Sequence, residues 1–202
     1  MADPQPARIA FDPPYRMDIT AAMNEDGVDA AQASRLWFVH QHHEVIEREI
    51  LQVLRNHPLD PSQELRTASE VIVVIEVGEV GCRPPSPVID STAWPRLVLK
   101  LPNDDSVVKN LHAILCHEFA HAVDRLDPEF GLSLDAVVPR KVLTLWNYSI
   151  DERLARNGVR VPHLVEEQID PRVASAVAAC ERPAYAWLVE LAGSGPIDNN
   201  NP

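Results

Sequence analysis

The five residues 117–121, His-Glu-Phe-Ala-His, combine side chains that can bind a divalent metal and use it. Histidines four positions apart on a helix point the same way, so both imidazoles can reach one Zn²⁺ at about 2.0–2.1 Å. A glutamate directly after the first histidine lies beside such a metal, where it can take a proton from a water. The spacing therefore predicts His117 and His121 as zinc ligands and Glu118 as the general base of a hydrolytic reaction.

A catalytic zinc needs a third protein ligand as well as one open position. Four downstream carboxylates are candidates: Asp124, Asp127, Asp151 and Glu152. Asp124 lies seven residues after His117, which is a rise of about 10.5 Å along a helix. Its short side chain does not span that rise, so we expect Asp124 to orient a ligand rather than to bind the metal.

The phase of the next predicted helix separates the two carboxylates that lie about 30 residues past His121. Its expected buried face is formed by Leu143, Trp146, Ile150 and Leu154. At about 100° per residue Asp151 flanks this face, whereas Glu152 lies further round, one turn from Arg156, where an exposed ion pair is natural. Phase therefore predicts Asp151 as the third zinc ligand.

The order of two strands, the motif helix and a carboxylate helix, over residues 70–158, resembles the small gluzincins, also called minigluzincins. This resemblance implies a zinc-dependent metallopeptidase of the α+β class, with a compact zincin-like fold in which a small twisted sheet packs on the motif helix and further helices. It also implies that residues 96–101 form an edge strand that pairs with an extended peptide or protein substrate. Because the family has a glutamate as third ligand, Glu152 stays open beside Asp151.

The spacing His-Glu-x-x-His-x5-Asp, which ends at Asp127, is similar to the snapalysin pattern among the metzincins. This chain departs from it, since Asp124 stands where that pattern has glycine and no methionine follows the motif. The gluzincins add a group that stabilises an oxyanion, for which Tyr148 and His112 are possible although neither lies on the expected face. The histidines within residues 39–43 do not stand four apart, which indicates a role in helix packing or at the surface.

The hydrophobic pattern divides the chain into an irregular arm at 1–27, one domain at 28–192 and a flexible tail at 193–202. Buried or half-buried strands are expected at 70–77 and 96–101. Helices are expected at 28–56, 107–125, 140–156, 163–169 and 173–191. Asp104, Asp105 or Ser106 is expected to cap the motif helix, Asn157-Gly158 to end the helix at 140–156, and Pro183 to break or kink the last helix.

Composition restricts the class of protein. The 202 residues carry a formal net charge of −12 without a basic patch, which argues against nucleic acid and anionic membranes as partners. The sequence contains no stretch of about 18 apolar residues, so no membrane span is expected. The N-terminus lacks a signal pattern, and a cytoplasmic location is therefore expected. The three cysteines form no C-x-x-C pair, which disfavours a disulfide framework or a cysteine zinc site.

Two other functions fit the same sequence. The first is a regulatory protein that has a zincin fold and binds zinc but has little or no proteolytic activity. The second is a helical interaction protein in which the five-residue motif occurs by chance and no metal binds.

Overall fold

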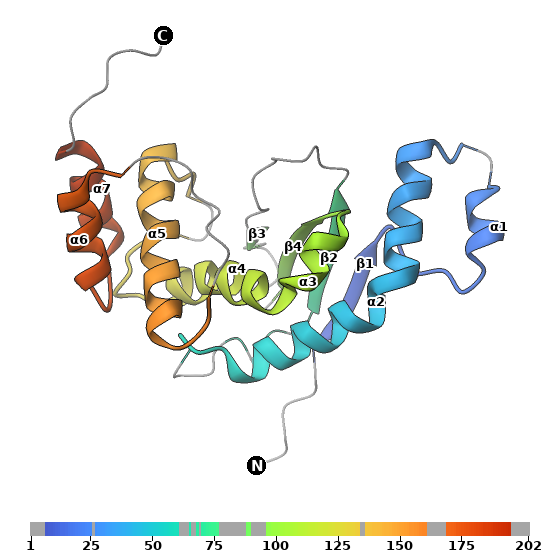
Figure 1. Ribbon diagram of the computed structural model, residues 1–202, viewed down its shortest axis with the longest axis horizontal. Helices are drawn as coiled ribbons and strands as arrows, with labels where there is room; N and C mark the ends of the chain where they lie inside the picture. The colour runs from blue at the N-terminus through green and yellow to red at the C-terminus, as the bar shows by residue number, and fades with distance from the viewer. Residues whose placement is uncertain are drawn as a thin grey trace, which may run out of the picture.

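The computed structural model describes residues 7–25, 27–60, 65, 68, 70–76, 88–89, 96–133, 136–160 and 169–194. Its elements, in chain order, are β1 (Arg8–Asp12), α1 (Ile19–Met23), α2 (Ala30–Asn56), β2 (Glu70–Glu76), β3 (Val88–Ile89), β4 (Arg96–Pro102), α3 (Asp105–Lys109), α4 (Leu111–Leu126), α5 (Arg140–Arg156), α6 (Pro171–Ala179) and α7 (Tyr185–Ser194). Helices α5, α6 and α7 stand at one end of the molecule and α1 with the start of α2 at the other, with α4 between them (Figure 1).

The sheet has the strand order β1-β2-β4-β3, in which β1, β2 and β4 are parallel and β3 is antiparallel to β4. Parallel neighbours require a crossover, and α2 supplies it between β1 and β2. The register pairs Val71 with Leu97 and Val73 with Leu99. All four of these side chains are buried, so alternate residues of the two central strands form one apolar face.

The prediction of an irregular arm at residues 1–27 is wrong over two stretches. Residues 8–12 form β1, which pairs with β2 from Arg8 opposite Glu70 to Asp12 opposite Val74, and residues 19–23 form α1. The partner of β1 lies some 60 residues further along the chain, so no local pattern reveals the pairing. Residues 1–6 lie outside the described part.

The prediction that residues 96–101 form an edge strand is wrong at Leu97 and Val98, because there β4 lies between β2 and β3. On the β3 side, Val88 pairs with Val98 and Ile89 with Leu97. The partner is a two-residue strand without a distinct hydrophobic pattern, which explains why the sequence did not indicate it. Within the described residues, the part of β4 beyond Val98 has no neighbour on that side.

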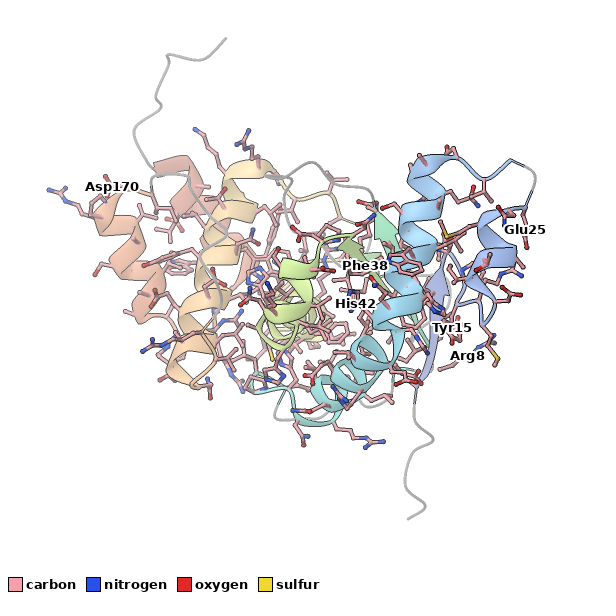
Figure 2. The ribbon with its side chains drawn as sticks, turned by 45° about the vertical axis from the view of Figure 1, so that its right-hand side comes forward. Arg8, Tyr15, Glu25, Phe38, His42 and Asp170 are labelled. Atoms are coloured by element: carbon pink, nitrogen blue, oxygen red, sulfur yellow. The ribbon has the colours of Figure 1, made fainter. Side chains whose placement is uncertain are left out.

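Helix α2 connects the sheet with the motif helix, since it contacts both β2 and α4. The carboxylate of Asp29 accepts a hydrogen bond from the amide of Gln32 and so caps its start. Its side chains also meet two other segments: His42 bonds Asp105 of α3, and the ring of Tyr15 stacks on His43. Figure 2 shows Tyr15 beside α2 and Asp170, which caps α6, at opposite ends of the molecule.

The helix expected at 107–125 is two helices, because Asn110 ends α3 and begins α4 with a non-helical backbone. The expected cap is confirmed at Asp104, whose carboxylate accepts from the amide of Ser106. Helices α2 and α5 agree with the predicted stretches at 28–56 and 140–156, and Gly158 follows α5 with φ of 82°, which favours glycine.

The helix expected at 173–191 is divided into α6 and α7, with Pro183 in the segment between them, as its missing amide hydrogen predicts. The predicted helix at 163–169 lies outside the described residues except for Ile169, which is not helical. The tail prediction is wrong at 193–194, which belong to α7, and the rest of the tail is not described.

The chain mixes helices with a small sheet, which is compatible with the α+β class predicted from the sequence. Side chains from strands and helices share one apolar core, in which Leu99, Phe119, Trp146 and Ile150 are almost fully buried. Within the described ranges, no helix combines the length and the apolar character that crossing a bilayer requires.

Candidate metal centre

The motif lies on α4, which is among the most buried helices of the molecule. Every side chain from Ile114 to Ala122 is buried, because α2 covers one side of the helix and α5 packs on another. His117 is 2% exposed, Glu118 2% and His121 5%. Three ionisable side chains buried on one helix need partners or a ligand, since burying an uncompensated charge is costly.

The two imidazoles lie as close as a shared metal requires. The ring centroids of His117 and His121 are 5.2 Å apart, with an interplanar angle of 75°. Two imidazoles that each bind zinc at about 2.0–2.1 Å, at a tetrahedral angle, have centroids roughly 5 Å apart. The separation of the histidine pair therefore suits one bridging ion.

Asp151 reaches the histidine pair from α5. Its Oδ1 lies 2.7 Å from Nδ1 of His117, and the aspartate is 8% exposed. Asp151, which the helical phase placed beside the buried face, is therefore a carboxylate that contacts the motif. With Nδ1 engaged, Nε2 is the nitrogen of His117 left for a metal, and a carboxylate on the other nitrogen orients a zinc-bound imidazole.

The contact on Nδ1 differs from the predicted direct ligand role of Asp151. A carboxylate on Nδ1 and a metal on Nε2 lie on opposite sides of the ring, so Asp151 does not do both in one arrangement. In the described part of the chain, no three His, Cys, Asp or Glu side chains converge to hold an ion.

Oε2 of Glu118 is buried and has no hydrogen-bond partner among the residues that the structure describes. Burial, reinforced by the charge of Asp151, raises the pKa of Glu118 well above its ordinary value. A carboxyl with a raised pKa is suited to accept and return protons near neutral pH. The environment of Glu118 is therefore compatible with the predicted general base.

His121 is held in its neutral form. Burial is the largest influence that lowers its pKa well below the ordinary value, followed by the nearby His117, Arg125 and Arg153, while a side-chain hydrogen bond with Asn147 opposes them. Neutral imidazole is the form that binds metals. The ring of His121 also meets the ring of Trp146 edge-on: the two ring centroids are 4.3 Å apart and the ring planes are at 88°.

Asp124 forms an ion pair that the sequence did not reveal. Its carboxylate accepts hydrogen bonds from the guanidinium of Arg153 at 2.6 and 2.8 Å and from Nε1 of Trp146 at 2.6 Å. The expectation that Asp124 does not bind the metal agrees with these contacts, although it touches Trp146 rather than a histidine. One signal was available: Arg153 lies seven residues after Trp146, on the buried face of α5, where an arginine requires a buried anion.

The other two carboxylate candidates have partners elsewhere. Glu152 interacts with Tyr148, and its backbone carbonyl accepts from Nε of Arg156 at 3.3 Å, so the expected pair with Arg156 uses the backbone. Asp127 ends α4 and accepts from the amide of Glu129. Asp124 and Asp127 also line a cavity of about 820 Å³ at this end of α4, which His117, Glu118 and His121 do not line.

The two side chains considered for oxyanion stabilisation have acidic partners, since Tyr148 interacts with Glu152 and His112 with Glu49. Nδ1 of His112 is 3.3 Å from Oε2 of Glu49. On α2, His40 bonds the backbone carbonyl of Arg16, and neighbouring histidines of that stretch contact other segments as described above. These contacts agree with packing and surface roles for the histidines of residues 39–43.

The donor set suits zinc. Zinc binds nitrogen and oxygen donors, and the site offers two imidazoles, an aspartate and an adjacent glutamate. Among the described residues, Oε2 of Glu118 is a buried oxygen without a hydrogen-bond partner, and it leaves polar capacity for a ligand. Comparisons with protein-family models, curated proteins and solved structures find no match for this chain.

Proposed function

We propose that this chain is a zinc-dependent metallopeptidase of the zincin type, in which His117 and His121 hold the metal and Glu118 is the general base. The observation that carries the proposal is the pair of buried imidazoles 5.2 Å apart, beside a buried carboxylate oxygen to which no described residue donates a hydrogen bond. Buried polar atoms without partners are rare in proteins, and a bound water or ion, strain or a catalytic role accounts for them.

Different residues of the chain have different roles in the proposed hydrolysis. Zinc, when bound, supplies acidity to a water and polarises a carbonyl. Asp151 holds His117 by Nδ1 at 2.7 Å and presents its other nitrogen. Glu118 takes the proton from the attacking water and delivers it to the leaving amine, roles favoured by its raised pKa.

Asp151 has two possible places in the zinc-loaded protein, and one measurement separates them. As the third ligand, its oxygen lies about 2.0–2.2 Å from the metal. As the orienting carboxylate, it keeps the bond to Nδ1 of His117 that supports this role here. A crystal structure of the zinc-loaded protein distinguishes them.

The proposal is tested by metal content and by hydrolysis together. Protein purified without chelator is expected to contain one zinc per chain by elemental analysis, and His117→Ala or His121→Ala to lose it. Glu118→Gln is expected to keep the zinc and to lose hydrolysis of a peptide library by about 10²–10⁴-fold, the range for a general base. Glu152→Gln, the same chemical change one residue after Asp151, is the matched control and is expected to keep both.

Two results would contradict the proposal. Wild-type protein without zinc, nickel, cobalt or iron removes the metal centre and favours a helical interaction protein. Unchanged hydrolysis in the zinc-loaded Glu118→Gln variant removes Glu118 as the base.

One observation favours a second function, a zinc-binding regulatory protein with little proteolysis. The motif side chains are at most 5% exposed, so an extended peptide does not reach them in this conformation. This alternative predicts stoichiometric zinc that exchanges slowly with a chelator, and no cleavage of any peptide in the library. Cleavage lost in Glu118→Gln would decide against it.

A further inference from the structure

A buried polar network lies between α4 and α5, next to the motif. Asp124 is 6% exposed, Trp146 1% and Arg153 7%, yet together they carry two charges and an indole N–H. Both oxygens of Asp124 are used: Oδ1 accepts from Nη1 of Arg153, and Oδ2 accepts from Nη2 of Arg153 and from Nε1 of Trp146. A bidentate pair of this kind fixes direction as well as distance.

The indole held by this pair is enclosed by three other groups. The ring of His121 meets it edge-on with centroids 4.3 Å apart, the ring of Phe130 lies 4.9 Å away, and the guanidinium of Arg125 lies 5.6 Å from the ring centre. Arg125 is itself held by backbone carbonyls, including that of Ser133. The indole therefore has one orientation, and His121 packs directly against it.

The two histidines of the motif differ in what orients them. His117 has the carboxylate of Asp151 on Nδ1, whereas His121 has an amide, Asn147, and the ring of Trp146. No carboxylate contact to His121 is found in the described residues. An imidazole without a carboxylate partner depends on packing to keep its plane.

We infer that Asp124 and Arg153 are positioning residues, which hold Trp146 so that its ring fixes the plane of the His121 imidazole for metal binding. The inference rests on the proposed zinc centre. It explains why an ion pair occupies the interface of α4 and α5, where apolar residues of similar volume often give equal or greater stability. The network acts on zinc affinity through His121, and none of its three members touches the metal.

The test compares variants by zinc affinity and by the visible spectrum of the cobalt-loaded protein. Trp146→Phe keeps an aromatic ring and the Asp124–Arg153 pair but removes the N–H bond; Asp124→Asn keeps an acceptor but removes the charge. Each is expected to weaken zinc binding about 10–100-fold, in competition with a chromophoric chelator, and to shift the cobalt bands. Trp187→Phe, the same change at a partly buried tryptophan of α7, is the control and is expected to stay within about twofold of wild type.

The outcomes separate this inference from the function on which it rests. Wild-type protein that binds no zinc removes both. Wild-type protein that binds zinc, with the same affinity and cobalt spectrum in Trp146→Phe, overturns only the positioning role. Urea unfolding in EDTA checks that each variant folds; since breaking the buried pair in Asp124→Asn is strongly destabilising, Trp146→Phe decides if that variant does not fold.

Discussion

Replacing Glu118 by glutamine is expected to stabilise the metal-free protein. The side chain of Glu118 is 2% exposed, and its Oε2 has no partner within the described ranges. Burial raises the pKa of Glu118, and the charge of Asp151 raises it further. Glutamine has almost the same shape without the charge. Its amide N–H groups are donors, and Asp151 offers an acceptor nearby, so the change removes repulsion without leaving a cavity.

The size of the effect follows from the unpaired oxygen. A buried polar group without a partner costs about 1–3 kcal/mol. If the substitution recovers this cost, the free energy of unfolding rises by about 1–3 kcal/mol at pH 7. With a urea m-value of about 2 kcal/mol per M, the unfolding midpoint moves up by roughly 0.5–1.5 M. The assay is urea unfolding followed by circular dichroism, with EDTA present throughout.

Two control variants show whether the buried charge of Glu118 is the cause of the gain. Glu152→Gln removes a charge that is only partly buried and is expected to change stability by no more than about 0.5 kcal/mol. Glu118→Ala removes the charge but leaves a cavity, so its gain is expected to be smaller than that of glutamine. A lower midpoint in Glu118→Gln than in wild type would refute the reasoning, because it would mean that the carboxylate is stabilised by interactions in the metal-free fold.

Burial lowers the pKa of His57, whose Nε2 lies 2.7 Å from the carbonyl oxygen of residue 116, so the folded state keeps this histidine neutral. The contribution of neutral His57 to the free energy of unfolding is therefore complete above the unfolded pKa of about 6.5. It is lost as pH falls below that value, by at most about 1.4 kcal/mol per pH unit. Urea unfolding between pH 5 and 8 in EDTA should show that the free energy of unfolding falls less steeply with acid in His57→Gln than in wild type. Leu115 is fully buried on α4, and Leu115→Ala should cost about 2–5 kcal/mol by thermal unfolding, against less for the partly buried Leu143→Ala; equal losses would contradict the core assignment. Burial and the charge of Glu49 raise the pKa of the Cys116 thiol to about 12. Iodoacetamide at pH 8 should therefore alkylate Cys116 more slowly than Cys180, as measured by peptide mass spectrometry. Faster labelling of Cys116 would contradict this and show that α4 opens readily.

Local patterns were sufficient for the two long helices α2 and α5. The three-and-four spacing of apolar residues predicted α2 and α5 within two residues at either end, and Asp104 and Gly158 supplied the signals for a start and a stop. These features depend on residues only a few positions apart, which is why they can be read from the chain itself.

The sheet was less predictable, because its pairing joins residues that are distant in sequence. β1 is a strand because it pairs with β2, and the two residues of β3 make β4 an inner strand at Leu97 and Val98. The helix is interrupted at Asn110, where the backbone is not helical. The apolar pattern of residues 107–125 is continuous and therefore did not predict this interruption. In each case tertiary context decided what propensity alone left open.

For the candidate site, the sequence by itself determined the three motif residues, since helical geometry alone places positions 117 and 121 on one face with 118 beside them. Helical phase placed Asp151 rather than Glu152 beside the buried face, and Asp151 contacts His117, whereas its role as third ligand stays a prediction. Only the packing of α5 on α4 decided that Asp151 contacts Nδ1 of His117 and that Asp124, Trp146 and Arg153 form one network behind His121. The reason is physical: a periodic pattern tells which way a side chain faces along its own helix, whereas its partner depends on the distance and angle between two helices, which the whole core sets.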